Sequence, residues 1–162
     1  MAAGLAATLL ALLWPGLPLG PTDLAARLSA WFACDLAAGL WLAIAVARLA
    51  RHRFFSDQDI DGVLRTGSSR AAVLQSLVQN TLEQTVLAVI AYGAWLLAPP
   101  VGPIQTAFIA VGCFSLGRLL FFLGYLRGAA ARSLGFTLTF YPTVGLLVAD
   151  GVRLLAPIQG LA

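Results

Sequence analysis

Long apolar stretches separated by short polar connections dominate this chain. Five such stretches occur, and their apolar residues are continuous rather than alternating with period two. A helix needs about 20 apolar residues to cross the hydrocarbon core of a bilayer, and only helices and closed barrels satisfy their backbone in lipid. The continuous pattern therefore predicts membrane helices and argues against a barrel. We expect these helices at residues 2–19, 28–49, 71–98, 104–126 and 134–155.

The first and last stretches have individual features. Residues 2–19 are few for a membrane span, and they lack the basic start and small-residue cleavage pattern of a signal peptide. We expect a membrane helix there, with an interfacial or re-entrant segment as the alternative. In the last stretch Pro142 lies inside the predicted helix, so we expect a kink at that point.

The connections between the stretches alternate in charge. Residues 48–70 contain five arginines and residues 127–132 contain two, whereas residues 99–103 contain no charge. The positive-inside rule places both arginine-rich connections in the cytoplasm. If the first stretch spans the membrane, the N-terminus is also cytoplasmic and the C-terminus is external.

Composition agrees with an all-α integral membrane protein. Of the 162 residues, 60% are hydrophobic and 10% are charged, with a mean hydropathy of +0.88, whereas soluble domains carry about 25% charged residues. The net charge is +3, but the arginines gather at membrane edges without an aromatic and basic stripe, which argues against nucleic-acid binding. His52 has no metal-ligating neighbours at a useful spacing, and we interpret Cys34 and Cys113 as small buried residues. We therefore expect no metal.

The connection at residues 55–69 contains three aspartates at alternate positions followed by glycine. This arrangement faintly resembles a calcium-binding loop, which needs a glutamate at its twelfth position. Counting from Asp57, the twelfth residue is Ser68. We therefore interpret the segment as a solvated polar loop.

Glu83 and Arg118 lie deep inside two of the predicted spans. A charge at bilayer depth is costly unless it is paired or lines a polar cavity, so such a residue is a site hypothesis by default. The helix rise places both residues roughly 13–18 Å from the cytoplasmic ends of neighbouring antiparallel helices. We expect Glu83 and Arg118 to be each other's partners.

Helical spacing adds polar and aromatic neighbours to this pair. Residues three and four apart share a face of a helix, which groups Asn80, Glu83 and Gln84 on one helix. On the next helix it groups Arg118, Phe121, Phe122 and Tyr125. These two faces could hold a zwitterionic or anionic ligand that enters from the cytoplasm. Equally, the polar side chains could only join the helices together.

Two signatures resemble the MAPEG family, the membrane-associated proteins of eicosanoid and glutathione metabolism. One is Asn80-Thr-Leu-Glu83, and the other extends from Gly117-Arg118 through Gly124-Tyr125 to Arg132. The resemblance covers roughly residues 30–155. It implies a four-helix bundle assembled as a homotrimer, formed by residues 28–162, with residues 1–27 as an extra N-terminal apolar helix and linker. All ten basic residues are arginine, which a GC-rich bacterial genome explains.

The resemblance implies a function and roles for individual residues. By position, Asn80, Glu83, Arg118 and Tyr125 contact glutathione, and Arg132 is the catalytic residue that stabilises its thiolate, the reactive form of a thiol. One of Arg48, Arg51 and Arg53 supplies a further basic contact, and the sequence does not distinguish among them. The expected protein is a glutathione-dependent transferase or peroxidase in a bacterial inner membrane, acting on lipophilic electrophiles from the bilayer.

The chain departs from the glutathione-conjugating members at three positions. Ser76 stands where they carry an arginine, and Gln84 and Phe121 stand where tyrosines occur. These changes remove one charge and two hydroxyls from the expected pocket. They favour an alternative, a non-catalytic protein of the same fold that binds a lipid or a partner protein. A transporter is disfavoured because the chain has no inverted repeat.

Overall fold

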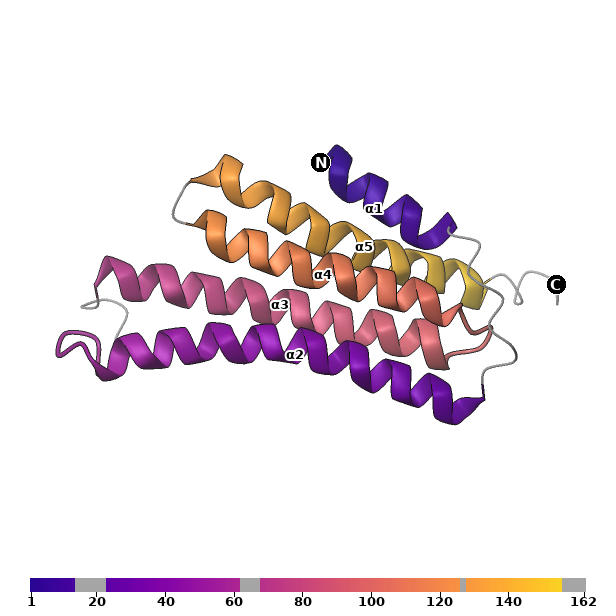
Figure 1. Ribbon diagram of the computed structural model, residues 1–162, viewed down its shortest axis with the longest axis horizontal. Helices are drawn as coiled ribbons and strands as arrows, with labels where there is room; N and C mark the ends of the chain where they lie inside the picture. The colour runs from indigo at the N-terminus through magenta and orange to yellow at the C-terminus, as the bar shows by residue number, and fades with distance from the viewer. Residues whose placement is uncertain (14–22, 62–67, 126–127, 156–162) are drawn as a thin grey trace.

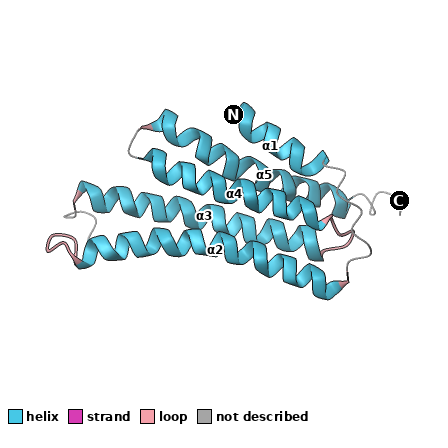
Figure 2. Ribbon diagram, viewed as in Figure 1, coloured by secondary structure: helices cyan, strands magenta, loops and turns pink. Residues whose placement is uncertain are grey.

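The computed structural model describes residues 1–13, 23–61, 68–125 and 128–155, and these residues form helices and short turns without strands. The helices lie side by side along the long axis of the molecule (Figures 1 and 2). They are α1 (Ala2–Leu13), α2 (Leu24–Phe54), α3 (Ser69–Leu97), α4 (Ile104–Gly124) and α5 (Ala129–Leu155).

Local sequence signals explain where two of the long helices begin. Asp23 precedes α2 and accepts a hydrogen bond from the backbone N–H of Ala26 at 2.8 Å. Ser68 precedes α3 and accepts one from the N–H of Ala71 at 3.2 Å. Such caps satisfy backbone donors that have no partner inside the helix. The helix α5 continues through Pro142 without interruption of its helical backbone.

The helices are those of an integral membrane protein. Within the described residues, three helices are long and apolar enough to cross a membrane: Leu24–Phe54, Ile104–Gly124 and Ala130–Leu155. The helix α3, predicted as a span at residues 71–98, has 29 residues and lies among them, but it is not one of these three. It carries Asn80 and Glu83, two of the predicted site residues. The end of α2, the start of α3, the end of α4 and the start of α5 lie at the same end of the molecule (Figure 1). We call this the arginine-rich end.

Helix packing brings the two halves of the chain together. The helices α2 and α3 pack against each other, as do α4 and α5, while α2 also contacts α4 and α3 also contacts α5. Small buried residues such as Ala38, Ala88 and Ala107 line the core beside Tyr92 and Phe114. Small side chains let membrane helices approach closely, so α3, α4 and α5 can share a narrow interior.

The described part of the first apolar segment, α1, is shorter than a membrane span. Its 12 residues extend for about 18 Å, compared with about 30 Å of hydrocarbon. It packs on α5 and α4 along the half of the molecule away from the arginine-rich end (Figure 1). Gly4 lies directly against the Thr137 carbonyl and the Tyr141 ring, where a larger residue would not fit. The rest of the predicted segment, residues 14–19, lies outside the described residues.

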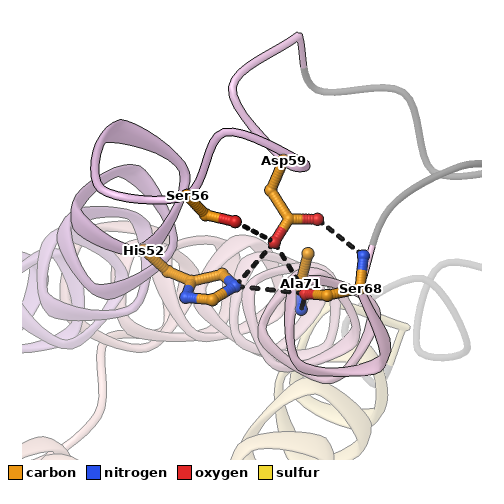
Figure 3. Close-up of polar contacts among 5 residues, drawn as sticks. All are labelled: His52, Ser56, Asp59, Ser68 and Ala71. Carbon is orange, nitrogen blue, oxygen red and sulfur yellow. Dashed lines mark hydrogen bonds and ion pairs between the residues drawn. The ribbon is translucent and has the colours of Figure 1, made fainter.

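The connection after α2 is folded around one carboxylate (Figure 3). Asp59 accepts hydrogen bonds from the Ser68 hydroxyl and N–H at 2.6 Å each and from the Ser56 hydroxyl at 2.8 Å, and His52 Nε2 lies 2.9 Å away. The prediction of a solvated loop is wrong for Asp59, which is only 2% exposed, although Asp57 and Asp61 are exposed. We call these four residues the Asp59 clasp. It fastens the end of α2 to the start of α3.

The stability that the Asp59 clasp contributes depends on pH, because its hydrogen bonds favour the ionised carboxylate. Donation from the Ser68 hydroxyl and N–H, supported by Ser56 and His52, lowers the pKa of Asp59 to about 2. Because this value lies below the unfolded value of about 3.9, the stabilisation is present above about pH 4 and is lost as the pH falls through 2. We expect Asp59→Asn to lower the melting temperature at neutral pH.

The measurement is thermal unfolding in detergent between pH 2 and 6 for the native protein and Asp59→Asn, with Asp57→Asn as the exposed control. The difference between the native protein and Asp59→Asn should shrink below about pH 4. A difference that stays constant down to pH 2 would contradict the assigned ionisation.

Candidate functional site

Arg118 is fully buried in the interior between α3, α4 and α5. Its Nη1 donates to the Asn80 Oδ1 at 2.9 Å, and its Nε and Nη2 both donate to the Thr139 Oγ1 at 3.1 Å. Its guanidinium also lies 4.6 Å from the centre of the Phe121 ring, a distance at which a cation is attracted by an aromatic face. Each of the three nitrogens of the guanidinium therefore donates to a side chain of its own chain.

Two glycines make room for this network. A side chain at Gly117 of α4 would collide with Thr139 Oγ1 and the Gly135 carbonyl, and one at Gly135 of α5 would collide with the backbone of Phe121 and Gly117. The backbones of α4 and α5 therefore touch beside Arg118. The Thr139 hydroxyl donates to the Gly135 carbonyl at 2.9 Å, which leaves its lone pairs to accept from the guanidinium.

The expected pair of Glu83 and Arg118 does not form. Glu83 is exposed on α3 and accepts a hydrogen bond from Gln79 Nε2 at 2.9 Å, while Gln84 is only 4% exposed. Each residue turns a helix by about 100°, so Glu83 and Gln84 lie on opposite sides of Asn80. Asn80 therefore points towards Arg118, Gln84 is buried and Glu83 faces outward.

A cavity of about 420 Å³ brings three of the five predicted site residues together. Asn80 of α3, Tyr125 after α4 and Arg132 of α5 all line it, with Ser133 and other residues of α5. The Arg132 guanidinium lies 5.2 Å from the centre of the Tyr125 ring. Arg118 joins this group through its hydrogen bond to Asn80, whereas Glu83 does not line the cavity. We call this the Arg132 cavity.

Sequence reasoning missed the contribution of α5 beyond Arg132. Thr139 holds Arg118, and Ser133, Phe136 and Thr137 line the Arg132 cavity. A signal was present, because Gly135 and Thr139 are one helical turn apart inside an apolar span. That spacing favours a close helix contact with a polar group beside it.

The three arginines at the end of α2 are distinguished by their contacts. Arg53 Nη2 donates to Gln75 Oε1 at 3.1 Å. Arg48 and Arg51 instead line a larger cavity to which Tyr125 also contributes. Tyr125 therefore lies between the Arg132 cavity and these two arginines.

The sequence profile of the MAPEG family matches residues 28–151. The chain belongs to the MAPEG family. No curated protein and no solved structure matches it in the corresponding comparisons. The MAPEG match includes all five predicted site residues and leaves α1 outside. Together with the three apolar helices, it identifies an integral membrane protein of the MAPEG family.

The Asp59 clasp, which lies outside the Arg132 cavity, does not have the geometry of a catalytic triad. In the Asp59 clasp the carboxylate and the Ser68 hydroxyl both meet the same nitrogen, His52 Nε2, and the hydroxyl donates to the carboxylate (Figure 3). A Ser–His–Asp nucleophile needs them on opposite ring nitrogens. Among the described residues no group of three or more His, Cys, Asp or Glu is placed to hold a metal.

We expect Thr139→Val to destabilise the protein by about 1–3 kcal/mol, because it leaves two donors of a buried guanidinium unsatisfied. The measurement is thermal unfolding in detergent. Thr81→Val is the matched control: its buried hydroxyl bonds only to the Leu77 carbonyl of its own helix, at 2.7 Å. Equal losses in the two variants would show that the bonds from Arg118 do not matter for stability.

Proposed function

We propose that the protein binds glutathione, or a related thiol, and presents its thiolate to a lipophilic electrophile from the bilayer. The observation that carries this proposal is the meeting of Asn80, Tyr125 and Arg132 around one cavity. Membership of the MAPEG family supports a thiol ligand.

Arg132 is suited to stabilise the thiolate. It is half-buried, lines the cavity and has no ion pair among the described residues. Its known contact is the face of Tyr125, which leaves its N–H donors available to a ligand. A guanidinium beside a thiol favours the anion, which is the nucleophile.

Asn80 and Arg118 are suited to orient the peptide part of the ligand. Arg118 occupies Asn80 Oδ1 and so fixes the amide with its two N–H donors available for a carboxylate or peptide carbonyl. Arg118 itself has three donor atoms engaged inside the chain. We therefore assign Arg118 as a positioning residue that acts through Asn80, and Tyr125 as a hydroxyl donor at the wall.

The reaction we propose is nucleophilic substitution or addition. The thiolate sulfur forms a bond to an electrophilic carbon, and the displaced electron pair leaves with the leaving group or stays on an opened ring. That group then takes a proton from water. The positive-inside rule puts the arginine-rich end in the cytoplasm, where a water-soluble thiol would enter while the electrophile arrives from the lipid. We place the protein in a bacterial inner membrane.

Glu83 supports assembly into a homotrimer of four-helix units. It lies 14 residues after the start of α3, about 20 Å along the helix, and it is exposed together with Gln79. A carboxylate facing lipid at that depth is costly. A second copy of the chain would cover it, and in that arrangement Glu83 would reach the ligand from the neighbouring subunit.

A non-catalytic function in the same fold is the alternative. The specific observation in its favour is the internal satisfaction of Arg118 by Asn80 and Thr139, which gives this residue a structural role without any ligand. Ser76 is exposed and its hydroxyl bonds only to the Ala72 carbonyl at 3.0 Å. The alternative predicts no dependence on a thiol.

We expect Arg132→Gln to lower turnover with glutathione and to shift the pH–rate profile to higher pH. If the guanidinium lowers the thiol pKa by about one unit, the thiolate fraction near neutral pH falls about tenfold without it. The measurement is conjugation of a lipophilic electrophile by purified protein across pH. Arg153→Gln is the matched control, because Arg153 also lies over an aromatic ring, Trp95, at 4.5 Å. Activity unchanged in Arg132→Gln would reject the role of Arg132.

Calorimetry of glutathione binding, combined with the oligomeric state in detergent, tests Glu83. We expect Glu83→Gln to remain folded, to weaken the trimer and to bind glutathione less tightly. Asn80→Ala should lose glutathione binding and remain trimeric, because the contact of Asn80 with Arg118 is made within one chain. No binding by the native trimer would favour the non-catalytic alternative.

A further inference from the structure

A second cavity of about 870 Å³ lies at the arginine-rich end between α2, α3 and α4. We call it the basic cavity. Its charged wall consists of Arg48, Arg51 and Arg70, and its apolar wall includes Leu77, Phe122 and Leu123. It is a separate space from the Arg132 cavity, and Tyr125 is the residue that the two share.

Within the part of the chain that the structure describes, the three arginines of the basic cavity have no acidic partner. No Asp or Glu lines the cavity, and the ion pairs among the described residues are His52–Asp59 and Arg153–Asp150. All three arginine side chains are exposed. Three like charges around one cavity repel one another, and an anion placed among them would relieve that repulsion.

Arginines at the other end of the molecule are engaged inside the chain. Arg27 donates to the Leu96 carbonyl at 3.3 Å and to the Gly102 carbonyl at 2.9 Å. Arg153 pairs with Asp150 and lies over Trp95. Open guanidinium groups are therefore a feature of the arginine-rich end of the molecule, and three of them line the basic cavity.

The first turn of α3 supplies part of the charged wall. Ser69 and Arg70 line the cavity and open this 29-residue helix, whose N-terminal Ser68 N–H already bonds to the Asp59 carboxylate. The anion site therefore depends on the arginine side chains. Guanidinium groups match phosphate oxygens with two parallel hydrogen bonds.

The apolar wall continues from the charged wall towards the membrane interior. Leu77 lies eight residues after Ser69 on α3, about 12 Å further along the helix. The Arg48 guanidinium lies 5.4 Å from the centre of the Phe122 ring, so the two walls meet there. A ligand that satisfies both walls has an anionic head and an apolar chain.

We infer that the basic cavity binds an anionic phospholipid of the cytoplasmic leaflet. Its phosphate lies among Arg48, Arg51 and Arg70, and an acyl chain lies against Leu77, Phe122 and Leu123. Basic pockets between membrane helices on the cytoplasmic side are suited to such headgroups. This inference does not rest on the proposed thiol chemistry, which we assign to residues of the Arg132 cavity.

Trp41 provides a direct probe of the occupied cavity. Its ring packs edge-to-face on Phe122 with the ring centres 5.6 Å apart, so a brominated acyl chain on Phe122 will quench its fluorescence. The protein in detergent is titrated with brominated phosphatidylglycerol and, separately, with brominated phosphatidylcholine. Trp41→Phe identifies the part of the quenching that comes from Trp41.

We expect brominated phosphatidylglycerol to quench Trp41 at a concentration at least about tenfold lower than brominated phosphatidylcholine does. The triple variant Arg48→Gln, Arg51→Gln, Arg70→Gln should lose this preference, and each single variant should lose part of it. Arg53→Gln removes a charge from the same end but outside the cavity, and it should keep the preference. A preference that survives the triple variant, or no preference in the native protein, would overturn the inference.

Competition separates a lipid from a soluble anion. Bound phosphatidylglycerol should resist millimolar inorganic phosphate and millimolar glutathione, because neither has an acyl chain for the apolar wall. Displacement by inorganic phosphate would reassign the cavity to a free anion. Displacement by glutathione would assign it to the thiol ligand instead, and either result would overturn the lipid.

Discussion

The satisfaction of one buried guanidinium organises the interior of this protein. Arg118 needs acceptors inside the membrane, and it finds them on α3 in Asn80 and on α5 in Thr139. These contacts require α4 and α5 to touch, which Gly117 and Gly135 allow. The same contacts set the position of Asn80 at the wall of the Arg132 cavity. Helix packing and the candidate site are therefore consequences of one electrostatic requirement.

The sequence predicts depth along a helix better than direction around it. Hydropathy gave the four long helices, because lipid forces every backbone group into helical hydrogen bonds, and it gave Arg118 as an interior residue. The pairing of Glu83 with Arg118 was wrong because matched depth does not fix which way a side chain points. Asp59 shows the same limit in a loop, since its burial depends on Ser68, nine residues away.

Tyr125 lines both the Arg132 cavity and the basic cavity. On one side its ring supports Arg132, and on the other it lines the basic cavity with Arg48 and Arg51. The Asp59 clasp holds α2 and α3 together at this same end (Figure 3). The arrangement keeps Arg48, Arg51 and Arg70 on one cavity, while Arg132, on α5, lines another. Their positive charges thus face separate cavities.

Arg118 and Glu83 differ in the partners that their own chain gives them, and this difference bears on assembly. Arg118 has partners within its own chain, so a single subunit can hold it without help. Among the described residues Glu83 is hydrogen-bonded only to Gln79, and both are exposed on α3. An amide weakens the cost of a carboxylate in lipid but does not remove its charge. The charge of Glu83 therefore still needs a partner at the surface of α3. Contact with a neighbouring copy of the chain would supply one.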